Sequence, residues 1–508
     1  MTTRRKRPAA KAVRRAPASS KDLAPVQEKD LLDFVEDSMR TYGVEVNLER
    51  SVPDFRDGLK PVARRLLWAM HQIGGDRQVK AARLVGDAMG KYHPHGDSSL
   101  FGATVTMVNL PVPPLGGEGN WGTLVDPPAS MRYVNCRTSA YGRTFFGRNY
   151  LPVTSMVPSF DRGAKEPLVL PTLLPNLLFN GASGIGVGVT TDIPSFTPKS
   201  VLAMMVRMLS GEKLSSDDFA KGLEFYHQYG GRVVKSKANL EAIRSFFSST
   251  KGTVQWESPI EVDEELKTVT LSKFAPGVRP VRLVEDRIKK MHEVKTASSG
   301  KGLSYVIACR KDLNLNEFRL FVQKVKKLTT TKYSYDIYVT ERLLLPDQDS
   351  KYKVNFLTCS IPELMARWLK WRCRLEAQSL DFQIAVVKKD IEFLKLLIYA
   401  ADHLDVIFKA LKVDDSAAFL VKHLKLTLEQ ANQILDLQVR RLSKLDQTKL
   451  KEKLKETLAY LKTLIEKRKK PSLEVKAFMQ TCLDRMEPYS QWAGTNQFKL
   501  SSSQKSSG

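Results

Sequence analysis

The sequence predicts a multidomain α+β protein with a helical first part, a central α/β domain and a C-terminal pair of long helices. Three observations support this fold class. At 508 residues the chain is too long for one hydrophobic core. Helical and strand-like stretches alternate over 201–355. From residue 361, apolar residues recur at alternating spacings of three and four, which is typical of long amphipathic helices.

The composition excludes several classes of protein. Hydrophobic residues make up 42% and charged residues 27%, as in ordinary globular proteins, and no apolar run approaches the roughly 20 residues that cross a bilayer. The first residues are basic and lack the apolar core of a secretory signal. The five cysteines have no C-x-x-C spacing, which argues for reduced thiols and against a zinc site or a disulfide framework. We therefore expect an intracellular protein.

The charge indicates a polyanionic partner. Lys and Arg number 80 against 55 acids, which gives a net charge of +25. Residues 1–21 contain eight of the cations and no acid, so the remainder is basic in its own right. Such a surface releases counterions when it meets a polyanion, and nucleic acid is the obvious candidate. A merely soluble basic protein is the alternative.

The N-terminal part is predicted to be a basic tail followed by helices. Residues 1–25 are rich in Ala, Pro, Arg and Lys and are expected to be disordered, as a nuclear address or an arm that binds DNA. "PVARRLLWAMHQIG" starts at a proline suited to a first helical turn. "VKAARLVGDAMGKYHPHGDSSLFGATVTMV" reads as helix, turn at "KYHPHGD", helix. This is the outline of a helix-turn-helix, whose second helix would lie near DNA.

The rest of the chain is predicted to change from a Gly- and Pro-rich segment (111–200) to strands and then long helices. The strand-like stretches are "KTVTLSKF", "LSYVIACR" and "YDIYVT". The first long helix, if continuous over about 45 residues, would reach roughly 65–70 Å. The second ends before Pro471, and 411–447 between them is long enough for a small helical knob. A plain helical bundle fits this pattern equally well. The end, 491–508, is polar and expected to be disordered.

Common catalytic motifs are missing from the sequence. There is no G-x-x-x-x-G-K-[ST] phosphate loop, and "NGASGIGVGV" (180–189) lacks the lysine and is not a nucleophile elbow. His93 and His95 of "HPH" have no further His or Cys nearby in sequence, so we expect phosphate contact or a structural turn there and no metal site. An enzyme of this sequence would take metal and nucleotide from a partner or need neither.

Six stretches of the sequence have distinctive motifs, of which "RDGLKP" and "KYHPHGDS" are the most specific. They are "VPDFRDGLKPVARRLLWAM" (52–70), "ARLVGDAMGKYHPHGDSS" (82–99), "GEGNWGT" (117–123), "ASMRY" (129–133), "PNLLFNGASGIGVGVTTDIP" (175–194) and "QANQILDLQVRRLSKLD" (430–446). Together, and in this order, they resemble the DNA-cleaving A-type subunit of type IIA topoisomerases, as in gyrase, topoisomerase IV and the T-even phage enzymes. The resemblance implies a winged-helix breakage-reunion domain (26–160), a tower domain (161–358) and a coiled coil (359–490) with a dimer gate at 411–447.

The resemblance implies that Tyr133 is the nucleophile, with Arg132 beside it. A free phenol has a pKa of about 10 and is a poor nucleophile at pH 7 without help. A cationic neighbour favours the phenolate and stabilises charge on the phosphate oxygens; Arg137 is a second candidate on weaker grounds. Attack on DNA would give a phosphotyrosyl ester and a free 3′-hydroxyl, so the break can be resealed. From the residues alone, a packing tyrosine is the commoner role.

Other matched positions imply DNA contacts. Two are special. Ser98 would begin the second helix of the helix-turn-helix, where a cap role competes with a DNA role. Ile185 matches an apolar wedge that kinks DNA, although without the resemblance we would expect it to be buried. The remaining positions all carry donors suited to phosphate, and each alone could be a solvated surface charge: Arg50, Lys60, Arg64, Arg65, His93 and His95.

The sequence also departs from the family. Ala63 stands where bacterial members usually have histidine, so one phosphate contact would be missing. Gly102 replaces an acid of quinolone-binding members, which puts quinolone sensitivity in doubt. The sequence stops soon after the predicted coiled coil, without the β-propeller, so we expect a compact phage-type subunit that does not introduce negative supercoils.

The resemblance finally implies partners and cofactors. We expect a homodimer through 411–447 that binds double-stranded DNA and pairs with a B-type subunit holding the ATPase and the Mg²⁺ site. The complex would be a cytoplasmic, ATP-hydrolysing topoisomerase that relaxes or decatenates DNA, in the nucleoid or in a phage-infected bacterial cell. A non-catalytic DNA-binding or architectural protein with the same fold is the rival interpretation. An RNA-binding protein has only the charge in its favour.

Overall fold

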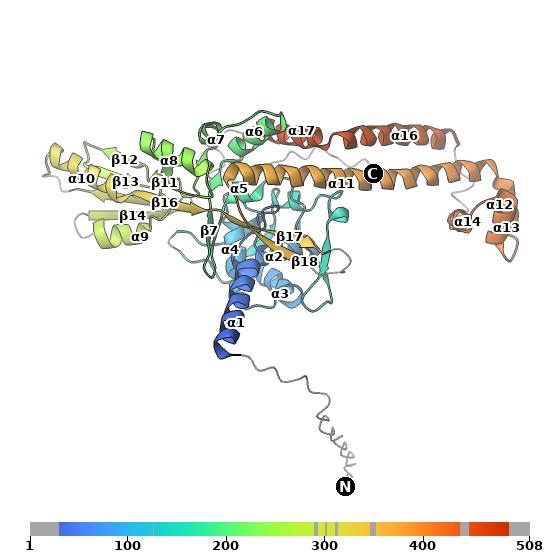
Figure 1. The fold of residues 1–508 in the computed structure, drawn as a ribbon, viewed down its shortest axis with the longest axis horizontal. Helices are drawn as coiled ribbons and strands as arrows, with labels where there is room; N and C mark the ends of the chain where they lie inside the picture. Colours follow the sequence, from blue (N-terminus) through green and yellow to red (C-terminus); the bar gives the residue numbers. More distant parts are fainter. Residues whose placement is uncertain are drawn as a thin grey trace, which may run out of the picture.

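The computed structural model describes residues 30–124, 126–288, 293–299, 302–309, 313–345, 352–436 and 447–486. The molecule mixes helices and sheets and is elongated: a sheet-rich extension leaves the central body on one side, and two long helices leave it on the other (Figure 1). The predicted tails 1–25 and 491–508 lie outside the described residues.

Helices form the part of the body that contains the expected helix-turn-helix. Pro61 occupies the first turn of its helix, and Leu66, Leu67 and Met70 are fully buried, as their helical spacing predicts. The expected helix, turn and helix are present as α3 and α4. The elements are α1 (Leu31–Val46), one turn of π-helix η1 (Asn47–Ser51), α2 (Pro61–Gln72), α3 (Ala81–Lys91) and α4 (Asp97–Val108).

A small antiparallel sheet completes this region. Its strand order is β1-β3-β2, with β1 (Val79–Lys80), β2 (Leu115–Glu118) and β3 (Asn135–Thr138). Cys136 lies opposite Val79 on one side and Gly117 on the other. The sheet therefore fixes the chain immediately after residue 133 against the start of α3.

Short elements connect this region to the sheet-rich extension. They include two β-ribbons, β4 with β5 and β8 with β9. The bounds are η2 (Gly142–Phe145), η3 (Leu151–Val153), β4 (Met156–Pro158), β5 (Lys165–Pro167), α5 (Asn176–Asn180), β8 (Ser195–Phe196), α6 (Pro198–Leu209), α7 (Ser216–Gly222) and β9 (Phe225–Tyr226).

The extension contains a five-stranded sheet in the order β10-β11-β16-β7-β6 and a four-stranded sheet in the order β12-β13-β15-β14. The predicted strand-like stretches fall on β13, β15 and the junction of β16 with β17. The bounds are β6 (Ala182–Ile185), β7 (Thr190–Ile193), β10 (Arg232–Val233), α8 (Lys237–Phe247), β11 (Lys251–Glu257), β12 (Ile260–Asp263), β13 (Thr268–Leu271), α9 (Pro280–Arg282), η4 (Leu283–Ile288), β14 (Glu293–Ser299), β15 (Gly302–Ala308), α10 (Leu315–Leu328) and β16 (Thr330–Asp336). The chain then returns to the central body, where β17 (Tyr338–Leu344) and β18 (Tyr352–Thr358) form a two-stranded sheet (Figure 1).

The two long helices form an arm. α11 (Ile361–Asp402) has 42 residues, and at 1.5 Å per residue it reaches roughly 63 Å. α16 (Gln447–Lys469) runs beside it in the opposite direction, with Leu380, Val387 and Leu464 buried between them (Figure 1). At the far end α12 (Leu404–Ala410), α13 (Ser416–Leu424) and α14 (Leu428–Leu435) enclose a core of their own. The arrangement is the predicted extended pair with a distal knob; residues 437–446 of that knob lie outside the described residues.

One large core joins parts of the chain that were expected to be separate domains. It runs from α2 through the five-stranded sheet to the base of α11 and to α17 (Pro471–Asp484), which returns to pack on α6. The domain limits at 160 and 358 stay a prediction. The sheet of β12–β15 has a second core with α10.

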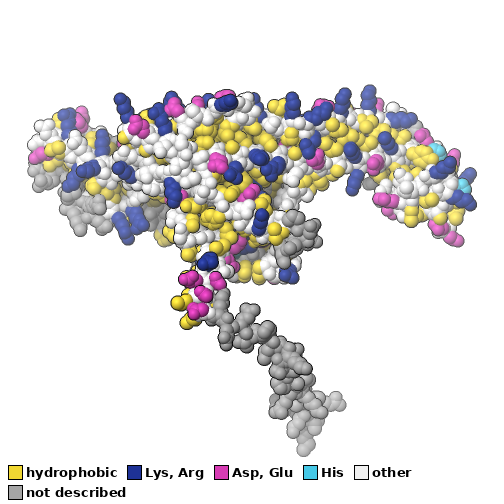
Figure 2. Space-filling model, viewed as in Figure 1, with side chains coloured by type: hydrophobic (Ala, Val, Ile, Leu, Met, Phe, Trp, Pro, Cys, Tyr) yellow, Lys and Arg dark blue, Asp and Glu magenta, His cyan; other side chains and the backbone are white. Residues whose placement is uncertain are grey.

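The surface of the described residues is rich in cations. Lys and Arg side chains are spread over the whole face in Figure 2, along the arm as well as over the body. No helix within the described ranges is long and apolar enough to cross a membrane.

Candidate functional site

Tyr133 lies on an exposed turn that is fixed to the start of α3. Its backbone N–H donates to Ser130 (2.9 Å), while the N–H groups of Ala81 and Ala82 donate to the carbonyls of Val134 and Met131. The side chain of Tyr133 is 65% exposed. A packing tyrosine would be buried, so this interpretation of Tyr133 is excluded and the phenol is open to a ligand.

Arg132 stacks on the ring of Tyr133. The central carbon of its guanidinium is 4.8 Å from the ring centroid, within the range of a cation–π contact. Arg132 and Arg137 are both exposed. The phenol therefore has a permanent positive charge beside it, and that charge can stabilise a phosphate bound at the hydroxyl.

Arg65 and His93 form a second basic group. Nη1 of Arg65 lies 3.0 Å from Nδ1 of His93, and the ring of His95 lies 4.3 Å from that of His93. Burial, together with the charges of Arg65, His95 and Arg50, lowers the pKa of His93 to about 4, so this ring is neutral at pH 7. Arg50 and His95 are exposed, whereas His93 is 7% exposed.

The two basic groups lie at opposite ends of α3. The turn of Tyr133 is bound to its first residues, and His93 follows its C-terminal residue by two positions, with its N–H donating to Ala88. Eleven residues of helix at 1.5 Å each separate them by about 16 Å. One copy of the chain thus does not bring Arg65 and His93 to its own Tyr133.

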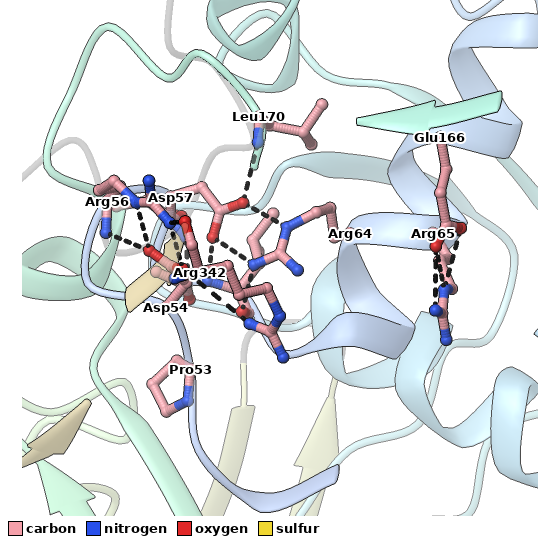
Figure 3. Close-up of polar contacts among 12 residues, drawn as sticks. Pro53, Asp54, Arg56, Asp57, Arg64, Arg65, Glu166, Leu170 and Arg342 are labelled. Atoms are coloured by element: carbon pink, nitrogen blue, oxygen red, sulfur yellow. Dashed lines mark hydrogen bonds and ion pairs between the residues drawn. The ribbon is translucent and has the colours of Figure 1, made fainter. Parts of the chain in front are cut away.

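Arg64 does not occupy the position that we expected from the sequence. Its side chain is 5% exposed and donates to Asp57 at 2.6 and 3.0 Å and to the carbonyl of Leu59 (Figure 3). Burial lowers the pKa of Arg64, but the adjacent Asp57 outweighs burial and raises it. The expected phosphate contact of Arg64 does not agree with this buried ion pair, which leaves Arg65, its neighbour in sequence, on the basic side of α2.

Lys60 connects the turn before α2 to the β6–β7 hairpin (182–193). Its ammonium donates to the carbonyl of Ser183 at 2.7 Å, and burial lowers its pKa. Arg50 and Lys60 both line a cleft of about 520 Å³ between α4, this hairpin and the five-stranded sheet. Tyr226 and His227 line the same cleft. The basic surface is therefore continuous with a polar and aromatic cleft.

Ile185 lies at the tip of the β6–β7 hairpin and is 83% exposed. The carbonyl of Ile185 accepts from the Ser51 hydroxyl at 2.9 Å, and the backbone of Val187 exchanges two hydrogen bonds with the side chain of Asn47. The alternative that Ile185 is a buried core residue is wrong. Its side chain projects from a tip whose backbone is fixed by η1, as an apolar wedge requires.

Ser98 is exposed on α4 but does not cap it. The helix begins at Asp97, the cap position is Gly96, and the carboxylate of Asp97 accepts from the backbone N–H of Ser98 at 2.7 Å. Gly102, one turn later, is exposed as well. Because the cap role is excluded, a surface contact is the role that remains for Ser98.

Three buried acidic side chains of the body are paired with arginines. Asp54, Asp57 and Glu166 bind Arg56, Arg64 and Arg65 respectively (Figure 3). Within the described ranges no three His, Cys, Asp or Glu side chains are arranged to hold a metal ion. The charged group in contact with Tyr133 is the guanidinium of Arg132, and the carboxylate of Glu118, which lies opposite Asn135, binds Gln78 and Asn135. Cations with one such carboxylate do not make a Mg²⁺ site.

Sequence reasoning missed the residues that hold the site in place. Asn47 and Ser51 belong to a helical turn with no motif, and nothing in "AKEP" marks Glu166. Asp57 stands inside "RDGLKP", which we used as a family signature without assigning the aspartate a role. Arg64 had a readable signal, since it precedes buried Leu67 by three positions on α2.

The chain matches a family model. The model, which describes the A subunits of DNA gyrase and topoisomerase IV, covers residues 50–484, which include Arg132 and Tyr133.

Curated relatives match over most of the chain. The DNA gyrase A subunit of Helicobacter pylori is 30% identical over 454 residues, covering 85% of this chain and 53% of the relative. The DNA topoisomerase 4 A subunit of Escherichia coli K12 is 28% identical over 443 residues, covering 83% of this chain and 56% of the relative. The chloroplastic/mitochondrial gyrase A subunit of Nicotiana benthamiana is 30% identical over 478 residues, covering 86% and 49%. The chain spans about half the length of these relatives.

Proposed function

The chain belongs to the family of DNA gyrase and topoisomerase IV A subunits, and we propose that it is the DNA-cleaving subunit of a type IIA topoisomerase. The observation that carries the proposal is the exposed Tyr133 with Arg132 stacked on its ring. A phenol in this environment is accessible to a DNA phosphate and is next to a group that can neutralise the charge on it.

The proposed reaction is a transesterification. The hydroxyl oxygen of Tyr133 attacks the phosphorus, a bond from that oxygen to phosphorus forms, and the bond to the 3′ oxygen of the preceding sugar breaks. The phenol gives up its proton and the leaving 3′ oxygen gains one, so the numbers of atoms and bonds are conserved. Because one phosphodiester replaces another, the reverse attack by the 3′-hydroxyl reseals the strand without an external energy source.

Two copies of the chain are required in this account. Since α3 separates Tyr133 from Arg65 and His93 by about 16 Å, the basic group of one copy would complete the site at Tyr133 of the other. A homodimer through the distal knob of the arm, the proposed C-gate, would give two such sites, one per strand. A second duplex could then pass through the double-strand break.

The proposal assigns the other elements to DNA binding. α2–α4 with the sheet β1-β3-β2 would be the winged-helix module, with α4 and Ser98 facing the duplex. The extended sheets would be the tower, and α11 with α16 the coiled coil. Arg50, Lys60 and His95 would donate to backbone phosphates, and Ile185 would enter between base pairs and kink the duplex. Lys60 suits this place because it also fixes the hairpin that carries Ile185.

Mg²⁺ and ATP would come from a B-type partner subunit. The cationic donors near Tyr133 do not fit a Mg²⁺ site, so no step is assigned to the metal here. ATP would drive the gating of the two duplexes and not the breakage of the strand, and the products would be relaxed or decatenated DNA.

A non-catalytic DNA-binding protein of the same fold is the rival. It would use the same basic surface and the same hairpin. It gives no reason for an arginine stacked on an exposed tyrosine, which favours the enzyme.

A cleavage assay separates the two functions. The chain is mixed with a B-type subunit, Mg²⁺ and supercoiled plasmid, and the reaction is quenched with detergent. Protein-linked double-strand breaks are expected, whereas Tyr133→Phe should bind DNA normally and form none. Breaks formed by Tyr133→Phe would refute the assignment of the nucleophile, and binding without breaks by the unmodified chain would favour the rival.

A further inference from the structure

Glu166 holds Arg65 by both oxygens of its carboxylate. It lies on β5, is 7% exposed, and accepts from Nε of Arg65 (3.0 Å to each oxygen) and from Nη2 (2.9 Å). Figure 3 shows the two side chains facing each other from β5 and α2. Two of the three guanidinium nitrogens thus face one carboxylate, which is the strongest geometry for this pair.

The third nitrogen of Arg65 determines which ring nitrogen of His93 carries the proton. Nη1 lies 3.0 Å from Nδ1 of His93. A guanidinium has no acceptor and stays charged at any pH at which proteins fold, so Nη1 must donate. Nδ1 must then carry a lone pair, and the single ring proton must be on Nε2. The same contact opposes protonation of His93, because a second proton on Nδ1 would face an N–H of Arg65.

We infer that Glu166 is a positioning residue that, through Arg65, keeps His93 as a neutral imidazole with its proton on Nε2. The consequence for DNA cleavage rests on the proposed function, whereas the state of the ring does not. A neutral ring in this tautomer is a directional hydrogen-bond donor toward a phosphate and adds no charge. In the part of the chain that the structure describes, Nε2 of His93 has no hydrogen-bond partner, so this donor is available.

The groups that face His93 come from every element packed around it. Arg65 belongs to α2, Arg50 to η1, and His95 to the turn that contains His93. Glu166, on β5, binds the other side of the Arg65 guanidinium. Arg65, Arg50 and His95 are cations or can become cations, and each disfavours a charged His93. Arg65 alone contacts a ring nitrogen, so its orientation decides the tautomer.

Removing the charge of Glu166 distinguishes a positioning role from a purely electrostatic one, because the two roles change the pKa of His93 in opposite directions. In Glu166→Gln the amide can accept one N–H, but its own NH₂ opposes the second, so the guanidinium is free to turn away. The pKa of His93 should then rise toward the ordinary value of about 6.5 and both tautomers should appear. If Glu166 acted only as a nearby negative charge, its removal would lower that pKa or leave it unchanged.

A matched control exists at the base of α11. Glu376 pairs with buried Arg372 at 2.8 Å and is 8% exposed, against 7% for Glu166. Glu376→Gln removes an equally buried carboxylate from an Arg pair away from His93. It should leave the state of the ring unchanged, so a general loss of packing can be recognised.

The test is ¹⁵N NMR of the full chain labelled at its seven histidines, with the His93 signals identified by their loss in His93→Gln. In the unmodified chain Nδ1 should be unprotonated and Nε2 protonated from pH 5.5 to 8. In Glu166→Gln the ring of His93 should titrate within that pH range. In Glu166→Asp, which keeps both carboxylate oxygens, a smaller rise in the pKa of His93 is expected. A protonated His93 at pH 6 in the unmodified chain would overturn the inference even if the variants fail to fold. So would an unchanged ring in a folded Glu166→Gln.

The cleavage assay gives the second readout. Glu166→Gln should lower the yield of covalent DNA adduct by about 10–100-fold, as expected when a residue that orients an active-site group is lost, while the Kd for DNA changes by less than about twofold. An adduct yield equal to that of Glu376→Gln would contradict the role in cleavage. If the unmodified chain forms no adduct, the proposed function fails, and the NMR result still decides the inference about His93.

Discussion

Asp57→Ala is expected to be one of the most destabilising single substitutions in the body. Asp57 is fully buried and accepts four hydrogen bonds: from Nε and Nη2 of Arg64 at 2.6 and 3.0 Å, and from the backbone N–H groups of Leu59 and Leu170, both at 3.0 Å. Removal of the carboxylate leaves the buried guanidinium of Arg64 without its ion-pair partner and two buried amides without an acceptor.

The size of the effect follows from this geometry. Breaking a buried ion pair by removing one partner costs about 3–5 kcal/mol, most of it from the charge left behind. At roughly 2–4 °C per kcal/mol for a unit of 150–250 residues, the Tm should fall by about 6–20 °C. The double variant Asp57→Ala/Arg64→Met removes both charges, so it should be more stable than Asp57→Ala.

Urea unfolding followed by tryptophan fluorescence measures these differences, with Trp68 of α2 as a local probe. The matched control is Glu212→Ala, which breaks an ion pair with Arg207 in which both side chains are more than 40% exposed, and it should cost far less. The reasoning is refuted if Asp57→Ala costs no more than Glu212→Ala. It is also refuted if the double variant is as unstable as the single one.

Three further predictions address the hairpin, the arm and the pH dependence. Ile185→Ala should reduce the bend of bound DNA, measured by energy transfer between the duplex ends, with little loss of phosphate-driven affinity; an unchanged bend would exclude the wedge. Leu464→Ala removes a side chain buried between α11 and α16, so it should destabilise the arm by about 2–5 kcal/mol, and hydrogen exchange should speed up in α16 but not in α2. For Asp54, burial alone would raise the pKa, but Arg56, Arg64 and Arg342 outweigh it and lower the pKa. This lowering stabilises the folded chain above the unfolded pKa of about 3.9, and the contribution is lost as pH falls through the folded pKa. In Asp54→Asn the free energy of unfolding should therefore fall less steeply as the pH is lowered. An unchanged pH dependence at acid pH would contradict this.

Local features of the fold could be predicted from the sequence because they depend on short-range patterns. The helical spacing of Leu66, Leu67 and Met70 predicts α2, and the repeat of three and four predicts α11 and α16. Tyr133 and Arg132 are adjacent in sequence, so their contact needs no knowledge of the fold.

Long-range contacts could not be predicted, since nothing local specifies them. Glu166 meets Arg65 across 101 positions, and Asp54 accepts from the backbone of Arg342 across 288. The different partners of Arg64 and Arg65 also depend on the fold. The two residues are neighbours, but on a helix they point about 100° apart, so one lies on the buried face with Leu67 and the other does not.

The most direct test of the central claim is the identity of the residue that becomes joined to DNA. The chain is trapped on DNA with its B-type partner, the complex is digested with nuclease and protease, and the modified peptide is sequenced by mass spectrometry. A nucleotide joined through its 5′ phosphate to the hydroxyl of Tyr133 is the expected result. A nucleotide on any other residue would contradict the account.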